Sequence, residues 1–237
     1  MIKTQSLGVV FGGTGSIGKS IVKQFSKNFK NVIVFSRNNA FNKNKKNIFY
    51  SNWNGQSEFP INLIKRKSIN SVVWSQGINF SDNIKSFKIS EHKTMYEANV
   101  IYILKSLNSM ISNNLLANSA RLCIVSSIWQ NLARQNKLSY TITKSALQGL
   151  VNSLTIDLGS AGFLVNAVLP GVINTPMTKK NLSRMQIENI KKVTPLKSLA
   201  TLEDISKLVY FLCSKNNSGI TGQFITVDRG FSNARIL

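Results

Sequence analysis

Short apolar runs rich in β-branched residues alternate along this chain with longer segments whose apolar residues recur at helical spacing. The first run, residues 7–11, is bounded by glycine and is followed by helical spacing from Ile17 to Phe25. Further runs occupy residues 31–36, 47–50, 71–75, 121–126, 163–169 and 222–227, and further helical patterns occupy residues 91–110, 139–158 and 202–214. Strands and helices in alternation predict an α/β fold with a doubly wound parallel sheet. In such a sheet, ligands bind beyond the carboxyl ends of the strands.

The length and composition of the chain suit a single folded unit. It has 237 residues, of which 43% are hydrophobic, so it can bury a substantial core. No low-complexity linker divides it, and we expect one domain over residues 1–237. No apolar run approaches the ~18 residues of a membrane span, and the N-terminus lacks a signal-peptide pattern. We therefore expect a cytoplasmic protein without a membrane partner, in which Cys123 is a reduced core thiol.

The net charge of +21 comes from 30 Lys and Arg residues against 9 Asp and Glu residues. Such a field attracts polyanions, which makes nucleic-acid binding an alternative function. The basic residues are scattered, however, without a long basic tail or an interleaved aromatic ladder. We therefore expect no specific nucleic-acid partner, and a general preference for anionic ligands such as phosphates.

A glycine-rich stretch, VVFGGTGSIGKS at residues 9–20, lies between the first strand and the first helix. Glycines in such a turn let the backbone approach a pyrophosphate, which then faces the helix N-terminus. The spacing is GxxGxxG, and the tighter GxGxxG is absent; the alternative is a tight turn without a ligand. The candidate cofactor-binding residues of this turn are Gly12, Thr14, Gly15, Ser16, Ile17 and Gly18.

The end of the second strand indicates which dinucleotide the turn would hold. A carboxylate often follows at this distance to bind the ribose hydroxyls, but this strand ends in Ser36 and Arg37. A small hydroxyl leaves room for a 2′-phosphate, and an arginine can pair with it. This favours NADP(H) over NAD(H), although a solvated arginine after a strand is also common.

A hydroxyl, a phenol and an amine follow the fifth strand at suggestive spacing. Ser127 directly follows the strand, and Tyr140 and Lys144 lie at i and i+4 of a helix, on one face. A nearby ammonium favours the phenolate and so is expected to lower the pKa of Tyr140. Hydride transfer to a carbonyl needs such a proton donor and a clamp for the substrate oxygen. The alternative is that Ser127 and Tyr140 are structural hydroxyls.

Together with these motifs, the chain resembles the short-chain dehydrogenase/reductase family in its compact, single-domain form, over essentially all 237 residues. The resemblance runs through VVFGGTGSIG, WSQG, EANV, IVSS, YTITK, VNAVLPGVINTPM and ITGQFITVDRG. It implies a Rossmann-type fold of three layers, with a seven-stranded parallel sheet between helices. It also implies an NAD(P)-dependent oxidoreductase acting on CH–OH groups, without a metal, that forms a homotetramer or dimer.

The resemblance also implies roles for individual residues. Tyr140 would be the general acid/base, Lys144 would lower its pKa and bind the nicotinamide ribose, and Ser127 rather than Ser126 would hold the substrate oxygen. Asn99 would anchor a water that relays protons to Lys144; the alternative is a polar residue that caps or kinks its helix.

Further residues would surround the cofactor by the same resemblance. Gly77 would let the backbone pass the adenosine side. Pro170 and Gly171 would shape the nicotinamide pocket, and Ile173 and Thr175 would meet the carboxamide. Thr175 could instead be only a turn former.

The chain departs from the pattern of the compact members at a few positions. Ser16 stands where a glycine is usual, and WSQG replaces the usual Asn-Asn-Ala-Gly. Asn52 stands in place of an aspartate that contacts adenine, and Arg229 in place of a glycine. These departures bear on cofactor affinity rather than on the chemistry.

The substrate is expected to be a small carbonyl or alcohol compound. Residues 172–200 would form a mobile lid that carries two methionines and several cations, namely Met177, Met185, Lys179, Lys180, Arg184, Lys191 and Lys192. These groups suit an anionic substrate or an acidic carrier, and a solvated amphipathic helix is the alternative. Trp129 is expected to wall the pocket, or to be core, and His92 to be a surface helix residue.

Three functions remain as alternatives. The first is an NADP(H)-dependent reductase, in which a 3-oxoacyl–carrier-protein reductase is the commonest family role. Members with that role tend to carry cations just before strands five and six. In this chain those stretches read NNLLANSA and GSAG and contain no cation, which weakens this role. The second is a nucleotide-binding sensor without catalysis, against which an intact Ser–Tyr–Lys set argues. The third is a nucleic-acid-binding protein.

Overall fold

The computed structural model describes residues 5–37, 45–66 and 68–234. At its centre is one parallel sheet of seven strands, in the order β3-β2-β1-β4-β5-β6-β7. The strands are β1 (Gln5–Phe11), β2 (Phe29–Ser36), β3 (Ile48–Asn52), β4 (Ile69–Trp74), β5 (Leu116–Val125), β6 (Leu164–Pro170) and β7 (Phe224–Val227). Each strand overlaps its predicted run, and the doubly wound α/β fold is confirmed. The strand order reverses between β1 and β4, which is where such sheets bind ligands.

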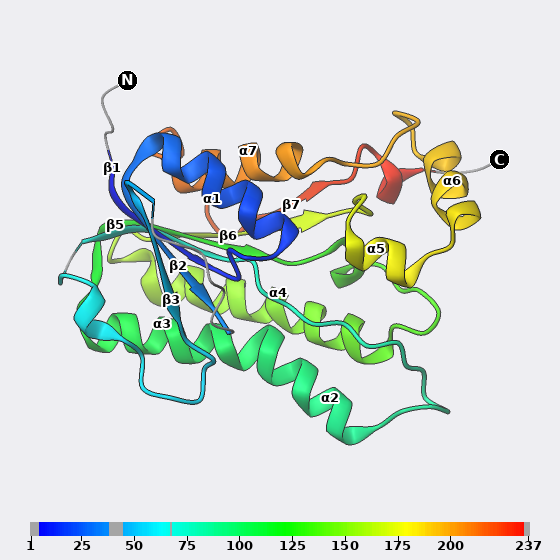
Figure 1. Ribbon diagram of the computed structural model, residues 1–237, viewed down its shortest axis with the longest axis horizontal. Helices are drawn as coiled ribbons and strands as arrows, with labels where there is room; N and C mark the ends of the chain where they lie inside the picture. The colour runs from blue at the N-terminus through cyan, green and yellow to red at the C-terminus, as the bar shows by residue number, and fades with distance from the viewer. Residues whose placement is uncertain (1–4, 38–44, 67, 235–237) are drawn as a thin grey trace.

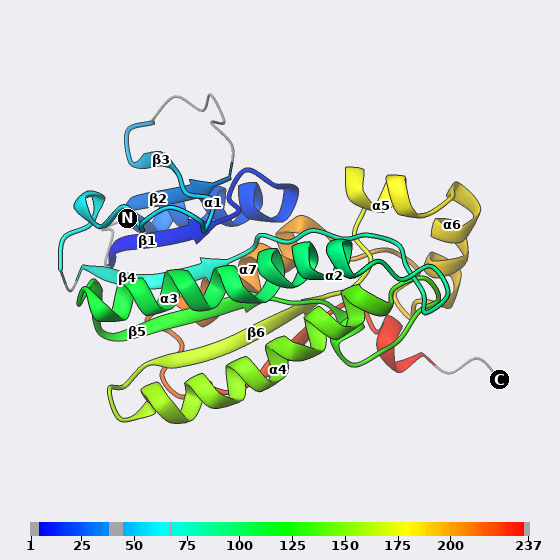
Figure 2. The ribbon, with the colours of Figure 1, turned by 90° about the horizontal axis from the view of Figure 1, so that it is seen from below.

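Helices cover both faces of the sheet and complete the three layers (Figures 1 and 2). On one face α1 (Ser16–Asn28) packs against α7 (Leu202–Cys213), and Ser20 Oγ joins them by a 3.1 Å hydrogen bond to the backbone oxygen of Leu202. The other face carries α2 (Ile89–Tyr96), α3 (Tyr102–Ser112) and α4 (Leu138–Gly159). None of the helices in the described ranges is long and apolar enough to span a bilayer.

The strands are apolar without alternation because both faces of the sheet are covered. On β1, Val9 and Phe11 face the layer of α3 and α4, and Val10 faces the layer of α1 and α7; all three are fully buried. The Phe11 ring stacks on Trp74 of β4, with ring centroids 5.8 Å apart. Burying one such side chain contributes about 1.5–3 kcal/mol to the free energy of folding. Packing of these side chains therefore holds the central strands in place.

The helical pattern predicted for residues 91–110 is not one α-helix. Between α2 and α3 lies a π-helical turn, Glu97–Ile101. Its Asn99 is 1% exposed, and its amide binds both backbone groups of Ile78. These contacts with the segment after β4 come from tertiary structure, which a helical periodicity does not predict.

Segment 172–200 lies at the end of the sheet where β5 and β6 finish (Figure 1). It contains two short helices, α5 (Pro176–Asn181) and α6 (Arg184–Val193). Thr175 caps α5 and Ser183 caps α6, which explains why each helix begins where it does. The segment therefore borders the carboxyl ends of the strands, where a substrate would lie.

Two cysteines distant in sequence meet in the core. Cys123 of β5 and Cys213 at the end of α7 are both buried, and no disulfide joins them. The expectation of a reduced core thiol at Cys123 is confirmed. Burial raises the pKa of the Cys213 thiol, and the contact with Cys123 acts in the same direction.

Candidate active site

The turn between β1 and α1 needs glycine at some positions and not at others. Gly12 has a φ of +71°, and a Cβ there would lie 2.5 Å from the backbone nitrogen of Gln76. A Cβ on Gly18 would lie 2.2 Å from the backbone oxygen of Gly12, whereas a Cβ on Gly15 would meet that oxygen at an ordinary 3.5 Å. Gly13, which the motif did not single out, also has no room, because a valine of β2 would be 2.5 Å away.

The N-terminus of α1 opens into a cavity. Gly15 is the N-cap residue and offers no side chain to the free amides, and the first turn holds no acidic residue. Such a terminus is a site for an anion. The cavity has a volume of about 400 Å³ and is lined by all six residues predicted in the turn, namely Gly12, Thr14, Gly15, Ser16, Ile17 and Gly18.

The other predicted cofactor residues converge on the same cavity. Ser36 is buried at the end of β2, and Arg37 is exposed beside it. The remaining lining residues that we predicted are Gly77, Tyr140, Pro170, Gly171, Ile173 and Thr175. Gly171 has no space for a side chain, because a Cβ would lie 2.5 Å from the Cβ of Asp228. Thr175 both lines the cavity and caps α5, so the turn-forming alternative also describes it.

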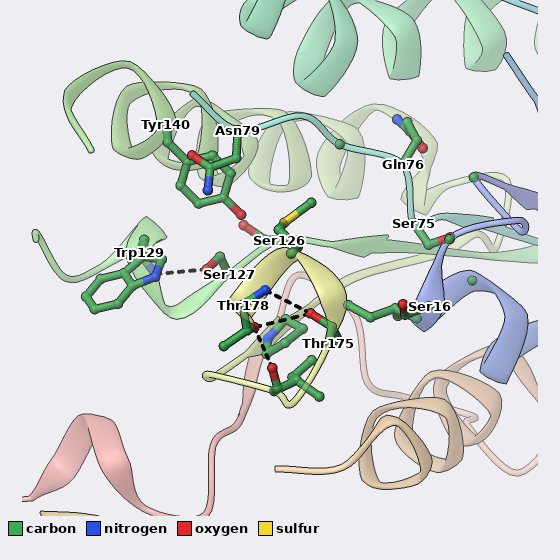
Figure 3. Close-up of a pocket in the computed structure, with 18 of the residues that line it drawn as sticks. Ser16, Ser75, Gln76, Asn79, Ser126, Ser127, Trp129, Tyr140, Thr175 and Thr178 are labelled. Carbon is green, nitrogen blue, oxygen red and sulfur yellow. Dashed lines mark hydrogen bonds between the residues drawn. The ribbon is translucent and has the colours of Figure 1, made fainter. Parts of the chain in front are cut away.

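The structure separates the roles of the two serines after β5 (Figure 3). Ser126 Oγ donates to the side-chain oxygen of Gln130 at 2.8 Å and is satisfied there. Ser127 Oγ accepts from the backbone nitrogen of Trp129 at 3.3 Å and hydrogen-bonds to the side chain of Tyr140. Ser127 is therefore the serine that faces the phenol.

Lys144 is buried behind Tyr140 and does not itself line the cavity. Its Nζ lies 5.7 Å from the centroid of the Tyr140 ring and donates to the backbone oxygen of Val125 at 3.1 Å. The end of β5 and one face of α4 thus hold the hydroxyl, the phenol and the ammonium together.

Asn99 uses both of its N–H groups on the protein. Nδ2 donates to the backbone oxygen of Ile78 and to Oγ1 of Thr143, each at 3.1 Å, and Oδ1 accepts from the backbone nitrogen of Ile78 at 2.9 Å. Thr143 directly precedes Lys144. The geometry makes Asn99 a positioning residue that ties the segment after β4 to α4. The π-helical turn fits the alternative of a residue that kinks its helix, and the water-anchoring role stays a prediction.

A family model of short-chain dehydrogenases, described as "Enoyl-(Acyl carrier protein) reductase", matches residues 64–232. The chain belongs to the short-chain dehydrogenase/reductase family. It is 26% identical to the 3-oxoacyl-(acyl-carrier-protein) reductase FabG of Buchnera aphidicola subsp. Baizongia pistaciae over 243 aligned positions, which cover 97% of this chain and 98% of the relative.

Solved structures share the fold at lower identity. One is a short-chain dehydrogenase family protein from Francisella tularensis, with a TM-score of 0.86 and 24% identity over 97% of this chain and all of that one. Another is ElxO with NADP bound, with a TM-score of 0.85 and 22% identity over 97% of this chain and all of that one. Both show the same fold.

Burial sets the protonation of the Tyr140–Lys144 pair in this dehydrogenase/reductase. It raises the pKa of Tyr140 to about 12, and the hydrogen bond from Ser127 acts in the opposite direction. It lowers the pKa of Lys144 to about 8. The expectation of a lowered pKa for Tyr140 is wrong for the chain alone, because desolvation of the phenolate is the largest effect on it. Tyr140 therefore keeps its proton at neutral pH.

Several residues of the cavity were missed by the sequence analysis. Both polar side-chain atoms of Gln76 are buried and have no hydrogen-bond partner among the described residues. Its position in WSQG, where the family has alanine, was a signal that it could contact a ligand. Asn79, Arg134 and Lys137 also line the cavity, and nothing in their local sequence marks them. Trp129, expected as a wall, is a lining residue.

The lid meets the cavity through apolar and hydroxyl groups. Met177, Thr178 and Leu182 line it. No lid cation whose side chain the structure describes is among the lining residues, and Lys191 pairs with Glu188 at 2.8 Å. The side chain of Lys180 lies outside the described part. For the described lid cations, this favours the alternative of a solvated amphipathic helix.

Arg229, one of the departures from the family pattern, has a structural explanation, and His92 lies differently from its expectation. Arg229 adopts a left-handed φ of +59°, the region that suits glycine, and its guanidinium pairs with Asp204 at 3.0 Å in the first turn of α7. His92, expected on the surface, is half-buried, and its Nδ1 lies 2.9 Å from Ser139 Oγ. Within the ranges that the structure describes, no three His, Cys, Asp or Glu side chains gather to form a metal site.

Proposed function

We propose that this chain is an NADP(H)-dependent oxidoreductase that transfers a hydride between the nicotinamide and a small carbonyl or secondary-alcohol substrate. The observation that carries the proposal is that Ser127 and Tyr140 meet at one cavity, with the Lys144 ammonium buried directly behind the phenol. The intact set argues against a nucleotide-binding sensor. The scattered distribution of charge argues against a dedicated nucleic-acid protein.

The cavity fits a dinucleotide on observations independent of catalysis. Gly12 and Gly18 let the turn pack so closely that neither position has room for a Cβ, and the amides of α1 face the cavity without a side-chain cap. Gln76 places two buried polar atoms at the same cavity, and neither has a hydrogen-bond partner in the part of the chain that the structure describes. Residues at the α1 end would hold the pyrophosphate, and those at the Tyr140 end the nicotinamide. When bound, the cofactor supplies the hydride that reduces the carbonyl carbon.

The chain's own residues would complete the reduction. Ser127 Oγ would donate a hydrogen bond to the substrate oxygen and hold it near the phenol. Tyr140 would donate its proton to that oxygen, which turns the carbonyl into the alcohol. Lys144 would stabilise the resulting phenolate through its charge. Asn99, through Thr143 and the backbone of Ile78, would keep α4 and the segment after β4 in register.

The preference for NADP(H) rests on the end of β2. Ser36 is small, and Arg37 lines the cavity there. A guanidinium pairs well with a phosphate monoester. The similar protein ElxO has been solved with NADP bound, which supports the choice.

A second candidate is a 3-oxoacyl–carrier-protein reductase. It is favoured by the similarity to the Buchnera aphidicola enzyme of that name over 97% of the chain. Acyl-carrier-protein thioesters and short thioesters without the protein distinguish the two candidates, because a carrier-protein reductase needs the protein to reach its full kcat/KM.

We further propose a single cytoplasmic domain, with segment 172–200 as its substrate lid, that assembles into a dimer or tetramer. Exposed apolar side chains on neighbouring helices support assembly. Leu104 and Ile111 of α3 are each 41% exposed, and Ile156 of α4 is 80% exposed. α3 and α4 lie on the same face of the sheet (Figure 2).

The direct test is NADPH oxidation, followed by absorbance, with ketones, oxoacyl thioesters and keto-sugars as substrates. The proposal predicts turnover of at least one class with NADPH, at a higher kcat/KM than with NADH. Tight NADPH binding without turnover of any carbonyl would instead favour the sensor.

A further inference from the structure

Apart from Arg37 at the end of β2, two cations line the cavity, Arg134 and Lys137. Both belong to the connection between β5 and α4, and Lys137 immediately precedes the first residue of α4. Lys137 stands three positions before Tyr140. Lys137 is the N-cap residue of α4, and Tyr140 lies in the first turn of that helix. Arg134 lies close enough to Lys137 to act on its charge, so both cations belong to the Tyr140 end of the cavity.

Lys137 is held in place by the segment after β4. Its Nζ donates to Asn79 Oδ1 at 2.9 Å and lies 3.4 Å from Ser81 Oγ. Asn79 also lines the cavity, on the same side as Tyr140 (Figure 3). The side chain is 4% exposed, so an ammonium has been brought out of water with only neutral partners at hydrogen-bond distance.

The charges around this pair do not cancel. No Asp or Glu lines the cavity, and within the described ranges no carboxylate forms an ion pair with Arg134 or Lys137. The carboxylate that acts on Lys137 is Asp82. Both Asp82 oxygens are already bound by Ser139, to its backbone nitrogen at 3.0 Å and its hydroxyl at 2.5 Å.

The pKa of Lys137 is consistent with the absence of a paired carboxylate. Burial and the nearby Arg134 lower the pKa of Lys137, and Asp82 acts in the opposite direction but does not outweigh them. A buried charge without a counterion destabilises the fold. A ligand anion between the two cations would supply the missing charge.

We propose that the substrate carries a carboxylate or another compact oxyanion within a few bonds of its reacting carbonyl, and that Arg134 and Lys137 bind this group. The inference rests on the proposed reductase function and specifies its substrate class. The phosphates of a dinucleotide would lie at the α1 end, so they leave this pair without a partner. A 3-oxoacyl thioester is neutral near its carbonyl, so the inference also separates the two candidate functions.

The rest of the pocket limits the body of such a substrate. Trp129, Met177 and Leu182 give the cavity apolar walls. A short oxo acid with a small apolar chain meets both the cations and these walls.

The test compares matched pairs that differ only in charge. Short 2-oxo, 3-oxo and 4-oxo acids are assayed with NADPH beside their methyl esters, and dihydroxyacetone phosphate beside dihydroxyacetone. We expect a kcat/KM at least about tenfold higher for the anionic member of one series, the size of one good charge-assisted hydrogen bond. The series that shows it identifies carboxylate or phosphate as the group.

Substitutions then assign the preference to the pair. Arg134→Gln and Lys137→Gln should each bring the acid-to-neutral ratio of kcat/KM towards one. Arg134 makes no hydrogen bond with another described residue, so its loss leaves the fold intact even if Lys137→Gln disturbs the Asn79 segment. The matched control, Lys179→Gln on the lid, should leave the ratio unchanged.

The possible failures are distinguishable. Reduction of neutral ketones as fast as of their anionic partners, or a ratio that survives Arg134→Gln, would overturn the anion site and leave the reductase function standing. Absence of turnover with every carbonyl, neutral or anionic, would overturn the proposed function itself, and the anion site with it.

Discussion

The Nζ of Lys144 lies 5.7 Å from the ring centroid of Tyr140. Lys144 is only 4% exposed, and a hydrogen bond from its Nζ to the backbone oxygen of Val125 fixes it to the end of β5. One lysine thus links the strand that carries Ser127 to the helix that carries the phenol. Its position also has an energetic cost, because burial lowers its pKa from 10.5 to about 8.

That cost makes stability depend on pH in a defined direction. Between about pH 8 and 10.5 the unfolded chain binds a proton on Lys144 that the folded chain has released, so the free energy of unfolding rises with pH across this window. Below pH 8 the full cost, on the order of 3 kcal/mol, is present. Lys144→Met removes this contribution. We expect the free energy of unfolding of the wild type to increase relative to that of the variant as pH rises from about 8 to 10.5. Urea denaturation of both proteins measures this, and a difference between them that is independent of pH would contradict it.

The glycine turn gives a matched pair of substitutions. Gly18→Ala places a Cβ 2.2 Å from the backbone oxygen of Gly12, whereas Gly15→Ala meets only an ordinary contact at 3.5 Å. We expect Gly18→Ala to destabilise the protein by at least about 1–3 kcal/mol and to weaken NADPH binding at least about tenfold. Gly15→Ala should have much smaller effects. Calorimetry and fluorescence titration measure both, and equal effects would refute the steric account of the turn.

Arg37 should discriminate between the two dinucleotides. Arg37→Ala removes a guanidinium that can pair only with the 2′-phosphate, so NADPH affinity should fall at least about tenfold while NADH affinity changes little. Titration of each cofactor against both proteins measures this. Equal losses for NADPH and NADH would remove the phosphate pairing from the account.

The two serines after β5 should differ in their importance. Ser127→Ala removes the hydroxyl that faces Tyr140, and kcat should fall by about 10²–10³-fold, as for other donors to a reacting oxygen. Ser126→Ala removes a hydrogen bond to Gln130 and should cost mainly stability, about 1 kcal/mol. The ratio of the two kcat values in NADPH oxidation is the readout, and a larger loss for Ser126→Ala would reverse the assignment.

Much of the architecture could be predicted because it depends on local patterns. The apolar runs that form β1 and β4 are buried on both faces of the sheet, so burial requires apolar residues at nearly every position. The positions of Ser127 and Tyr140 followed from their spacing after such a run. Arg37 could be placed at the cofactor end because it directly follows β2.

What could not be predicted depends on contacts between distant segments. Asn99 in the π-helical turn bonds to the distant Ile78, and Lys137 is held at the cavity by Asn79. His92 is drawn into contact with Ser139 by the packing of α2 on α4. The pKa of Tyr140 was predicted in the wrong direction because its burial is invisible in the sequence.

The measurement that tests the central claim most directly compares wild type and Tyr140→Phe in NADPH oxidation with the best carbonyl substrate, beside an NADPH titration of both. The substitution removes one hydroxyl, the proton donor, and leaves the ring. The account predicts that kcat falls by about 10²–10⁴-fold while NADPH affinity is retained. A variant that keeps near wild-type turnover would show that Tyr140 is not the proton donor, and the proposed mechanism would be wrong.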